Sequence, residues 1–347
     1  MAIELSNLTF TDEDDIVPES GVEQIVNTGI ANTLAGDDKI TGTGGTYSIE
    51  NFGTLNTADG NDVIIGVSNS QEGNTLYSYG ILNRYGSTLN TGDGNDIVMG
   101  IGYGPNNYSI DGIFNQGTIN TGDDDDIITG THSDSGINNN NYGIIDTGNG
   151  SDTITGTGSS FGIQNYSIFN TGDGNDKITG NANSFGFGIV NNSGTMDTGA
   201  GDDEITGTNT KGLGIYNLSG TIDTGDGNDK ITGTGGTNGI DNTGIIKTGN
   251  GKDSIIANGG FNGTGSVFLG NGQDYLKGFG SGNFNGENGK DTLELTPGSY
   301  TVRISPVGHK FIKGGIIMNT VGFEQLIAGD QTYDFANLTA GQIIVVA

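Results

Sequence analysis

The chain has 347 residues, a formal net charge of −29 and no cysteine. The acidic balance excludes a nucleic acid as the main partner, because nucleic acids attract basic surfaces, and it favours a cation instead. The lack of cysteine excludes disulfides and thiolate metal sites, and no stretch approaches the run of about 18 apolar residues that a transmembrane helix needs.

Residues 1–21 do not fit the repeat that follows them. Ile3, Leu5, Leu8 and Phe10 predict a short strand, and residues 12–15 are all acidic. The segment has no basic start and no long apolar run, so it does not have the features of a secretory signal peptide. We expect it to cap the first turn of the repeat, because an open end would be an unpaired sheet edge.

One unit recurs through residues 22–293, and its clearest copy spans residues 221–233. It contains a short strand, a tight glycine-rich loop and a second short strand. We call the last aspartate of each loop the anchor aspartate. Neighbouring anchors lie between 17 residues (Asp274 to Asp291) and 34 residues (Asp62 to Asp96) apart. The anchors are Asp38, Asp62, Asp96, Asp126, Asp152, Asp176, Asp203, Asp229, Asp253, Asp274 and Asp291.

Three apolar positions recur in the copies: one in an Ile-x-Asn segment, one seven residues before the anchor and one two residues after it. Single apolar residues between polar ones are typical of strands, and no helical period appears. The pattern predicts an all-β fold, a right-handed parallel β-helix (β-solenoid) of about eleven rungs with three short strands per rung. The asparagines of the Ile-x-Asn segments, Asn27 to Asn242, predict a ladder of side chains that bond one another and the backbone at a corner.

Two copies carry insertions, at residues 65–80 and 99–112, which contain Tyr77, Tyr79, Tyr103 and Tyr108. Insertions in a solenoid map to one face, often the binding face. These segments either contact a glycan or a protein, or they only pack their own tyrosines.

The repeat changes after Asp253, where the spacing shortens and the Ile-x-Asn segment disappears. We expect the three-sided prism to flatten there towards a two-sided roll. Residues 294–347 leave the repeat. Apolar runs at 300–304, 311–312, 316–318 and 323–327 predict a C-terminal cap of antiparallel strands, which could also hold a secretion signal.

The loops have the form Gly-x-Gly-x-Asp, in which only the anchor is present in all eleven copies. The residue three before the anchor is Asp, Asn or Ala, which predicts a surface position. Stacking brings anchor carboxylates to about 4.8 Å from one another, where each pair repels by about 3.5 kcal/mol at an effective dielectric of 20. A Ca²⁺ ion bound by two anchors and several loop carbonyls would remove this repulsion, and Mg²⁺ fits such a shell less well. The alternative is that each anchor only caps its own turn.

Residues 224–232 resemble the RTX or haemolysin-type nonapeptide GGxGxDxUx, a calcium-binding β-helix repeat. The resemblance recurs over roughly residues 33–293. It implies several Ca²⁺ ions between stacked loops, folding outside the cell as calcium loads, and type I secretion through an uncleaved C-terminal signal. The β-rolls of that family carry two nonapeptides in each turn, whereas most turns of this chain are longer and carry only one. The resemblance therefore supports a single row of calcium ions.

These features favour a secreted or cell-surface structural protein that calcium makes rigid, and not an enzyme. They leave open whether its partner is the cell surface, a polysaccharide or another copy of the chain. A polysaccharide-active enzyme is disfavoured because His132 and His309 are the only histidines and no nucleophile or acid–base motif appears.

An ice-binding or glycan-binding β-solenoid is the main alternative. Five Thr-x-Thr segments follow the anchors and predict an outward array, which resembles the ice-binding faces of some β-solenoid antifreeze proteins. The array is interrupted at 63–66, at 98–100 and at Asn181, and threonine also simply favours strands. The pairs are Thr41 and Thr43, Thr129 and Thr131, Thr155 and Thr157, Thr206 and Thr208, and Thr232 and Thr234.

Overall fold

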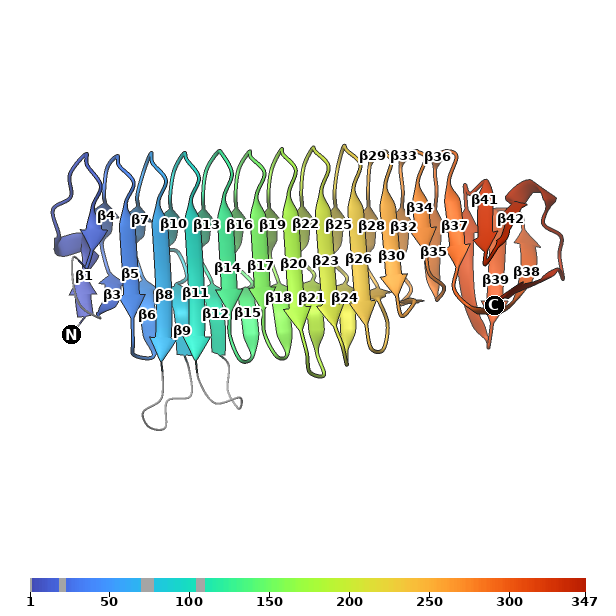
Figure 1. The fold of residues 1–347 in the computed structure, drawn as a ribbon, viewed down its shortest axis with the longest axis horizontal. Coiled ribbons are helices and arrows are strands. Elements are labelled where there is room, and N and C mark those ends of the chain that lie inside the picture. The colour runs from blue at the N-terminus through green and yellow to red at the C-terminus, as the bar shows by residue number, and fades with distance from the viewer. Residues whose placement is uncertain (1, 19–22, 70–77, 104–109) are drawn as a thin grey trace.

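The structure, a computed structural model, describes residues 2–18, 23–69, 78–103 and 110–347. These residues form short strands that run across the axis of a long rod (Figure 1). Their only helices are two single 3₁₀ turns, η1 (Leu5–Asn7) and η2 (Phe335–Asn337). The described part of the chain contains no helix long and apolar enough to cross a membrane.

Three long sheets form the sides of the rod, and within the repeat all their neighbouring strands pair in parallel. Sheet A contains, in order, β1 (Ala2–Glu4), β3 (Gln24–Asn27), β6 (Tyr47–Asn51), β9 (Ser78–Asn83), β12 (Ile110–Asn115), β15 (Ser135–Asn139), β18 (Phe161–Asn165), β21 (Phe187–Asn192), β24 (Leu213–Leu218), β27 (Ile240–Asn242) and β31 (Phe261–Asn262). The predicted all-β parallel solenoid is confirmed.

Sheets B and C continue past sheet A into the C-terminal region. Sheet B contains β2 (Ile16–Val17), β5 (Lys39–Thr43), β8 (Val63–Asn69), β11 (Ile97–Tyr103), β14 (Ile127–Thr131), β17 (Thr153–Thr157), β20 (Lys177–Ala182), β23 (Glu204–Asn209), β26 (Lys230–Gly235), β30 (Ser254–Asn258), β34 (Tyr275–Lys277), β37 (Thr292–Leu295), β41 (Gln325–Ala328) and β42 (Gln331–Asp334). Sheet C contains β4 (Ile30–Asn32), β7 (Thr54–Asn56), β10 (Thr88–Asn90), β13 (Thr118–Asn120), β16 (Ile144–Asp146), β19 (Ile168–Asn170), β22 (Thr195–Asp197), β25 (Thr221–Asp223), β28 (Ile245–Lys247), β32 (Ser266–Phe268), β35 (Gly282–Asn285), β40 (Ile316–Val321), β39 (Gly308–Lys313), β38 (Gly298–Ser305) and β43 (Ile343–Val346). Short bridges β29 (Asn250–Gly251), β33 (Asn271–Gly272) and β36 (Asn288–Gly289) join the last loops.

The core is a narrow column with one buried apolar residue from each sheet in each rung. In the rung of Asp229, these residues are Ile215, Ile222 and Ile231, all with no exposed surface. The strands pair without a slip, for example Ile205 beside Ile231 in sheet B, so each apolar position stacks on its own kind. The three predicted apolar ladders are therefore the core of the rod.

A ladder of buried asparagines fills the corner between sheets A and C, as predicted. The Nδ2 of Asn165 donates to the Oδ1 of Asn191 (2.9 Å), and the same bond repeats from Asn27 to Asn242. The Asn165 Nδ2 also donates to the carbonyl of Thr195 in sheet C (2.9 Å). Each asparagine thus joins two rungs and two sheets.

The N-terminal segment corrects one expectation. A strand was expected through Phe10, but β1 covers only residues 2–4 and is followed by η1. In addition, Ile3 pairs with Ile25 and Val17 pairs with Ile40. The described part of this segment is therefore an incomplete extra rung, in register with the repeat rather than outside it.

Sheet A ends at β31, which lies after Asp253, so the third side of the rod extends further than expected. An isolated parallel bridge also joins Phe261 to Gly280. Strands β38, β39 and β40 are antiparallel, and so are β41 and β42. The cap is not purely antiparallel, however, because β40 pairs in parallel with β35 and β41 with β37. Two solenoid sheets therefore run directly into the cap.

The inserted segments are described only in part, and Tyr77 and Tyr108 lie outside the described residues. Tyr79 is buried on sheet A, and its ring stacks 5.7 Å from that of Tyr47 and 5.2 Å from that of Phe114. Tyr103 is exposed. Of the two described tyrosines of these segments, Tyr79 thus packs within the rod and Tyr103 is exposed.

Candidate metal centre

The structure brings all eleven predicted anchors into one row at the edge between sheets C and B. Each follows a sheet C strand and directly precedes a sheet B strand, as Asp229 does between β25 and β26. Figure 1 shows the loops that carry them as one line along the upper edge of the rod. Every anchor side chain is buried, with at most 2% of the residue exposed.

The loop glycines are required by the stacking of the rungs. Gly225 and Gly227 have φ angles of 79° and 153°, which side chains rarely adopt. A Cβ on Gly227 would lie 1.7 Å from the carbonyl oxygen of Gly201 in the previous rung. The carbonyl of each loop therefore points along the row at the backbone of the next loop.

One oxygen of each anchor carboxylate caps the backbone of the previous rung. The Oδ1 of Asp229 accepts a hydrogen bond from the backbone N–H of Asp203 at 2.9 Å. The same bond links every consecutive pair of anchors, at 2.7 to 3.0 Å. The anchors therefore hold neighbouring rungs together rather than capping their own turns.

Two residues that were not predicted complete this ladder. The N–H of Asp15 donates to the Oδ1 of Asp38 (2.7 Å), and the N–H of Asp291 donates to Glu324 Oε2 (2.7 Å). Neither lies in a recognisable loop. Their position in the sequence could have indicated them. Each lies two residues before a core residue, Val17 or Leu326, as every anchor lies two residues before a core residue of its own rung.

The second oxygen of each carboxylate has no partner. The Oδ2 atoms of all eleven anchors are buried and receive no hydrogen bond. Burial raises the pKa of Asp96 to about 7, that of Asp126 to about 8 and that of Asp229 to about 6. The charges of neighbouring anchors also raise the pKa of Asp96 and Asp126, whereas those of the outer loop residues Asp202 and Asp226 raise the pKa of Asp229. A row of this kind either binds protons or requires cations.

In nine of the eleven copies, a buried threonine five residues before the anchor opposes this shift. Thr91 lies beside Asp96, and its hydroxyl lowers the pKa of that carboxyl, although burial outweighs it. The hydroxyl also donates to the carbonyl of Thr121 in the next rung (3.2 Å). The threonines add a row of oxygen atoms beneath the carboxylates.

The outer residues of the loops form ladders of their own. Asp202 accepts a bond at Oδ1 from the N–H of Asn228 in the next rung (2.7 Å), so this ladder runs opposite to that of the anchors. The positions three before the anchor, such as Asp173 and Asp226, are exposed as predicted. The loops are thus tied to both neighbours without these residues entering the row.

A cation in the row would meet only oxygen donors. Among the described residues, no three acidic or histidine side chains converge on one point, so carboxylates alone cannot fill a coordination shell. Backbone carbonyls are available, because no hydrogen bond reaches the carbonyl oxygen of Gly60, Gly94 or Gly174 in the described structure. Carboxylate and carbonyl oxygens are the donors that Ca²⁺ prefers. The residues present therefore fit calcium.

The histidines do not form a second centre. Nδ1 of His132 accepts a bond from the N–H of Asp134 (3.0 Å), and burial lowers the pKa of this histidine to about 4. His309 lines a groove of about 520 Å³ beside the cap, together with Lys310 and Phe268. No carboxylate lines that groove, so it lacks a carboxylate acid–base pair.

Comparisons of the chain with protein-family models, curated proteins and solved structures give no match.

Proposed function

We propose that this chain is a calcium-binding structural protein of the RTX type, exported from the cell, whose anchor row binds Ca²⁺ and makes the rod rigid. The observation that carries the proposal is the row of eleven buried Oδ2 atoms without a partner. An isolated buried carboxylate costs several kcal/mol unless it is paired, protonated or bound to a metal. A divalent cation removes that cost and the repulsion between neighbouring anchors.

Within the site, this chain's own residues hold the oxygen donors in place. Each anchor's Oδ1 is fixed by the N–H of the previous rung, which leaves Oδ2 available to a cation. The glycine carbonyls that point along the row supply further oxygen donors. Calcium would supply the positive charge that the chain lacks, since its net charge is −29.

The test is a calcium titration of protein first treated with EDTA, followed by circular dichroism and calorimetry. We expect the β signal and the melting temperature to rise steeply with Ca²⁺ and much less with Mg²⁺. A protein that is fully folded in EDTA, with no bound calcium detected by calorimetry, would contradict the proposal. The anchors would then act only as protonated caps between rungs.

Export and location belong to the same proposal. Assembly of the rod outside the cell would suit a site that loads at extracellular calcium concentrations. Candidate partners are the cell surface, a polysaccharide or another copy of the chain. Immunoblotting of culture medium and washed cells, with and without EDTA, measures whether the protein is released or surface-bound.

A further inference from the structure

The outward face of sheet B carries two columns of small uncharged side chains. In strands β14 to β26, residues alternate between the core and the outside, so the first and third residues after each core isoleucine face outward. The first column contains Thr129, Thr155, Thr179, Thr206 and Thr232, and the second contains Thr131, Thr157, Asn181, Thr208 and Thr234.

The columns are in exact register, because these strands pair without a slip. Thr155 lies beside Thr179, and Thr179 beside Thr206. Asn181 was expected to interrupt the array, but it replaces a threonine only in the second column, and the first column continues through Thr179. Neighbours lie about 4.8 Å apart along the rod and about 6.7 Å apart within a strand.

The array is largely free of internal bonding. In the described structure no hydroxyl of the first column makes a hydrogen bond to protein, and Thr234 alone in the second accepts one, from Asn258 Nδ2 (3.1 Å). The Oγ1 atoms of Thr179 and Thr232 are buried, so the γ-methyl groups of these two residues face the solvent. The first column is thus regular in its residue type, but its hydroxyl groups are not all at the surface.

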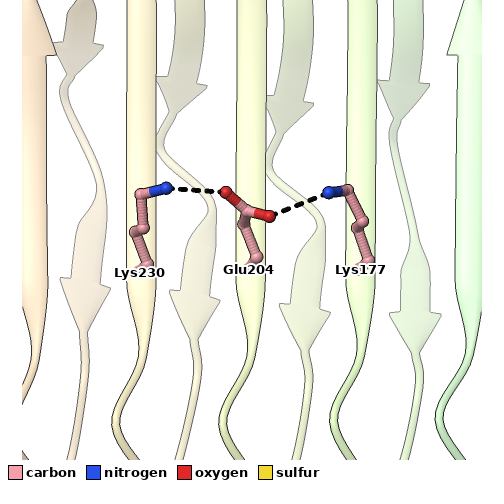
Figure 2. A network of polar contacts seen from close by, with 3 residues as sticks. All are labelled: Lys177, Glu204 and Lys230. Carbon is pink, nitrogen blue, oxygen red and sulfur yellow. Dashed lines mark hydrogen bonds and ion pairs between the residues drawn. The ribbon is translucent and has the colours of Figure 1, made fainter.

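Charged residues on these strands are held beside the array. Figure 2 shows Glu204 between Lys177 and Lys230, with ion pairs of 2.9 and 2.8 Å. These residues form a separate column nearer the anchors, and their charges bind one another. Ten consecutive outward positions in the two threonine columns therefore carry no charge, in a chain whose net charge is −29.

The strands that carry these columns are regularly arranged. Figure 1 shows β14, β17, β20, β23 and β26 side by side, evenly spaced and nearly parallel, although most sheets twist visibly. Towards the N-terminus the same columns continue as Ile65, Val67, Met99 and Ile101. The uncharged face therefore extends beyond the threonines as an apolar surface.

We propose that this threonine face binds ice. Water bound to a regular, uncharged array of this kind is held near the spacings of the array, about 4.8 Å along the rod and about 6.7 Å within a strand. Both are of the same order as the repeats of the oxygen lattice in ice. Charged side chains would instead order water around themselves, so their absence from the two threonine columns favours binding to ice. The ligand is the ice surface, so the function is independent of a protein or glycan partner. It rests on the proposed function only in requiring a folded rod.

The test uses the full chain with saturating calcium. Wild-type protein is expected to show thermal hysteresis and to enter slowly growing ice. In the double variant Thr155→Tyr and Thr206→Tyr, bulky rings rise above the plane, and most of the hysteresis should be lost. The matched control, Thr195→Tyr and Thr221→Tyr, changes outward threonines of sheet C and should keep wild-type activity.

Circular dichroism on each variant separates this proposal from that for calcium. Folded wild-type protein without hysteresis overturns ice binding, and so does a folded sheet B variant that retains full activity. A chain that binds ice in EDTA and for which calorimetry detects no bound calcium overturns the calcium proposal alone. If the sheet B variant fails to fold, the test uses the smaller double variant Thr155→Val and Thr206→Val, which removes only the hydroxyls. Loss of hysteresis then supports ice binding, and full retention overturns it.

Discussion

A single carboxylate has two separate tasks at each anchor. Its Oδ1 bonds the N–H of the previous rung, while its Oδ2 stays buried and unpartnered. Asparagine can perform the first task but not the second, since its amide nitrogen cannot bind a cation. The two tasks can therefore be separated by a substitution that hardly changes shape.

Asp152→Asn is expected to destabilise the rod with calcium but not without it. With calcium at 100 times its dissociation constant, the loss of one site should lower the free energy of unfolding by about 2.7 kcal/mol. In EDTA the substitution should be neutral or stabilising, because it removes a buried charge. Denaturant unfolding in both buffers measures this. The control is Asp226→Asn, at an exposed loop position, which should change the free energy of unfolding by less than about 0.5 kcal/mol in either buffer. A destabilisation by Asp152→Asn in EDTA would contradict the assignment of Oδ2 as a cation ligand.

Gly227→Ala should destabilise the rod by more than about 1 kcal/mol, because the site has a φ of 153° and no space for a Cβ. Gly44→Ala is the matched control, since Gly44 also has a positive φ (83°) but nothing lies within 4 Å of its Cβ position. Thermal unfolding with calcium compares the two. Equal effects would show that backbone conformation, and not the stacked carbonyl, requires the glycine.

At the scale of elements, the asparagine ladder determines how sheet A meets sheet C. Asn165 accepts from Asn139 and donates to Asn191 and Thr195, and all of these contacts are lost together in a leucine of similar size. Buried polar groups left without a partner cost about 1 to 3 kcal/mol each.

Asn165→Leu is therefore expected to lower the free energy of unfolding by several kcal/mol. Asn170→Ala, which removes a half-buried bond to Asp146 on the outer face of sheet C, should cost less than about 1 kcal/mol. Hydrogen exchange should also show the loss of protection in Asn165→Leu concentrated in the neighbouring rungs, as nearest-neighbour coupling in a solenoid requires. Uniform loss along the rod would contradict that local effect.

The elements that repeat were the ones that the sequence predicted. The core ladders, the asparagine ladder and the anchor row all follow from one period, because stacking converts an identical position into a contact. Asp15 and Glu324 were missed because they form the two ends of the anchor ladder outside any Gly-x-Gly loop, Asp15 as a backbone donor and Glu324 as a carboxylate acceptor. The parallel pairing of β40 and β41 was missed because apolar runs indicate strands but not their partners. The free Oδ2 atoms depend on burial, which only the folded rod shows.

At the scale of the whole molecule, the anchor row links stability to pH. Burial raises the pKa of Asp126 to about 8 and that of Asp176 to about 6, from 3.8 in an exposed carboxyl. Without metal the folded state thus binds protons more tightly than the unfolded state does. The stabilisation is complete below about pH 4 and is lost as the pH rises through 6 to 8.

In EDTA, the melting temperature is therefore expected to fall between pH 5 and pH 8, in contrast to an ordinary acidic protein. In saturating calcium it should rise over the same interval, because Ca²⁺ and protons compete for the same oxygens. Calorimetric scans across this range in both buffers measure the two slopes. A rise with pH in EDTA would contradict the unpaired, buried state of the row.

The direction of the anchor ladder has a consequence for the order of assembly. The N–H of each loop is satisfied by a side chain from the rung that follows it in the chain, up to Glu324 in the cap. A rod that assembles from its amino-terminal end therefore cannot complete the hydrogen bonds of any rung until the next rung has formed. The growing rod always carries one unfinished turn at its tip, and only the carboxy-terminal cap closes it.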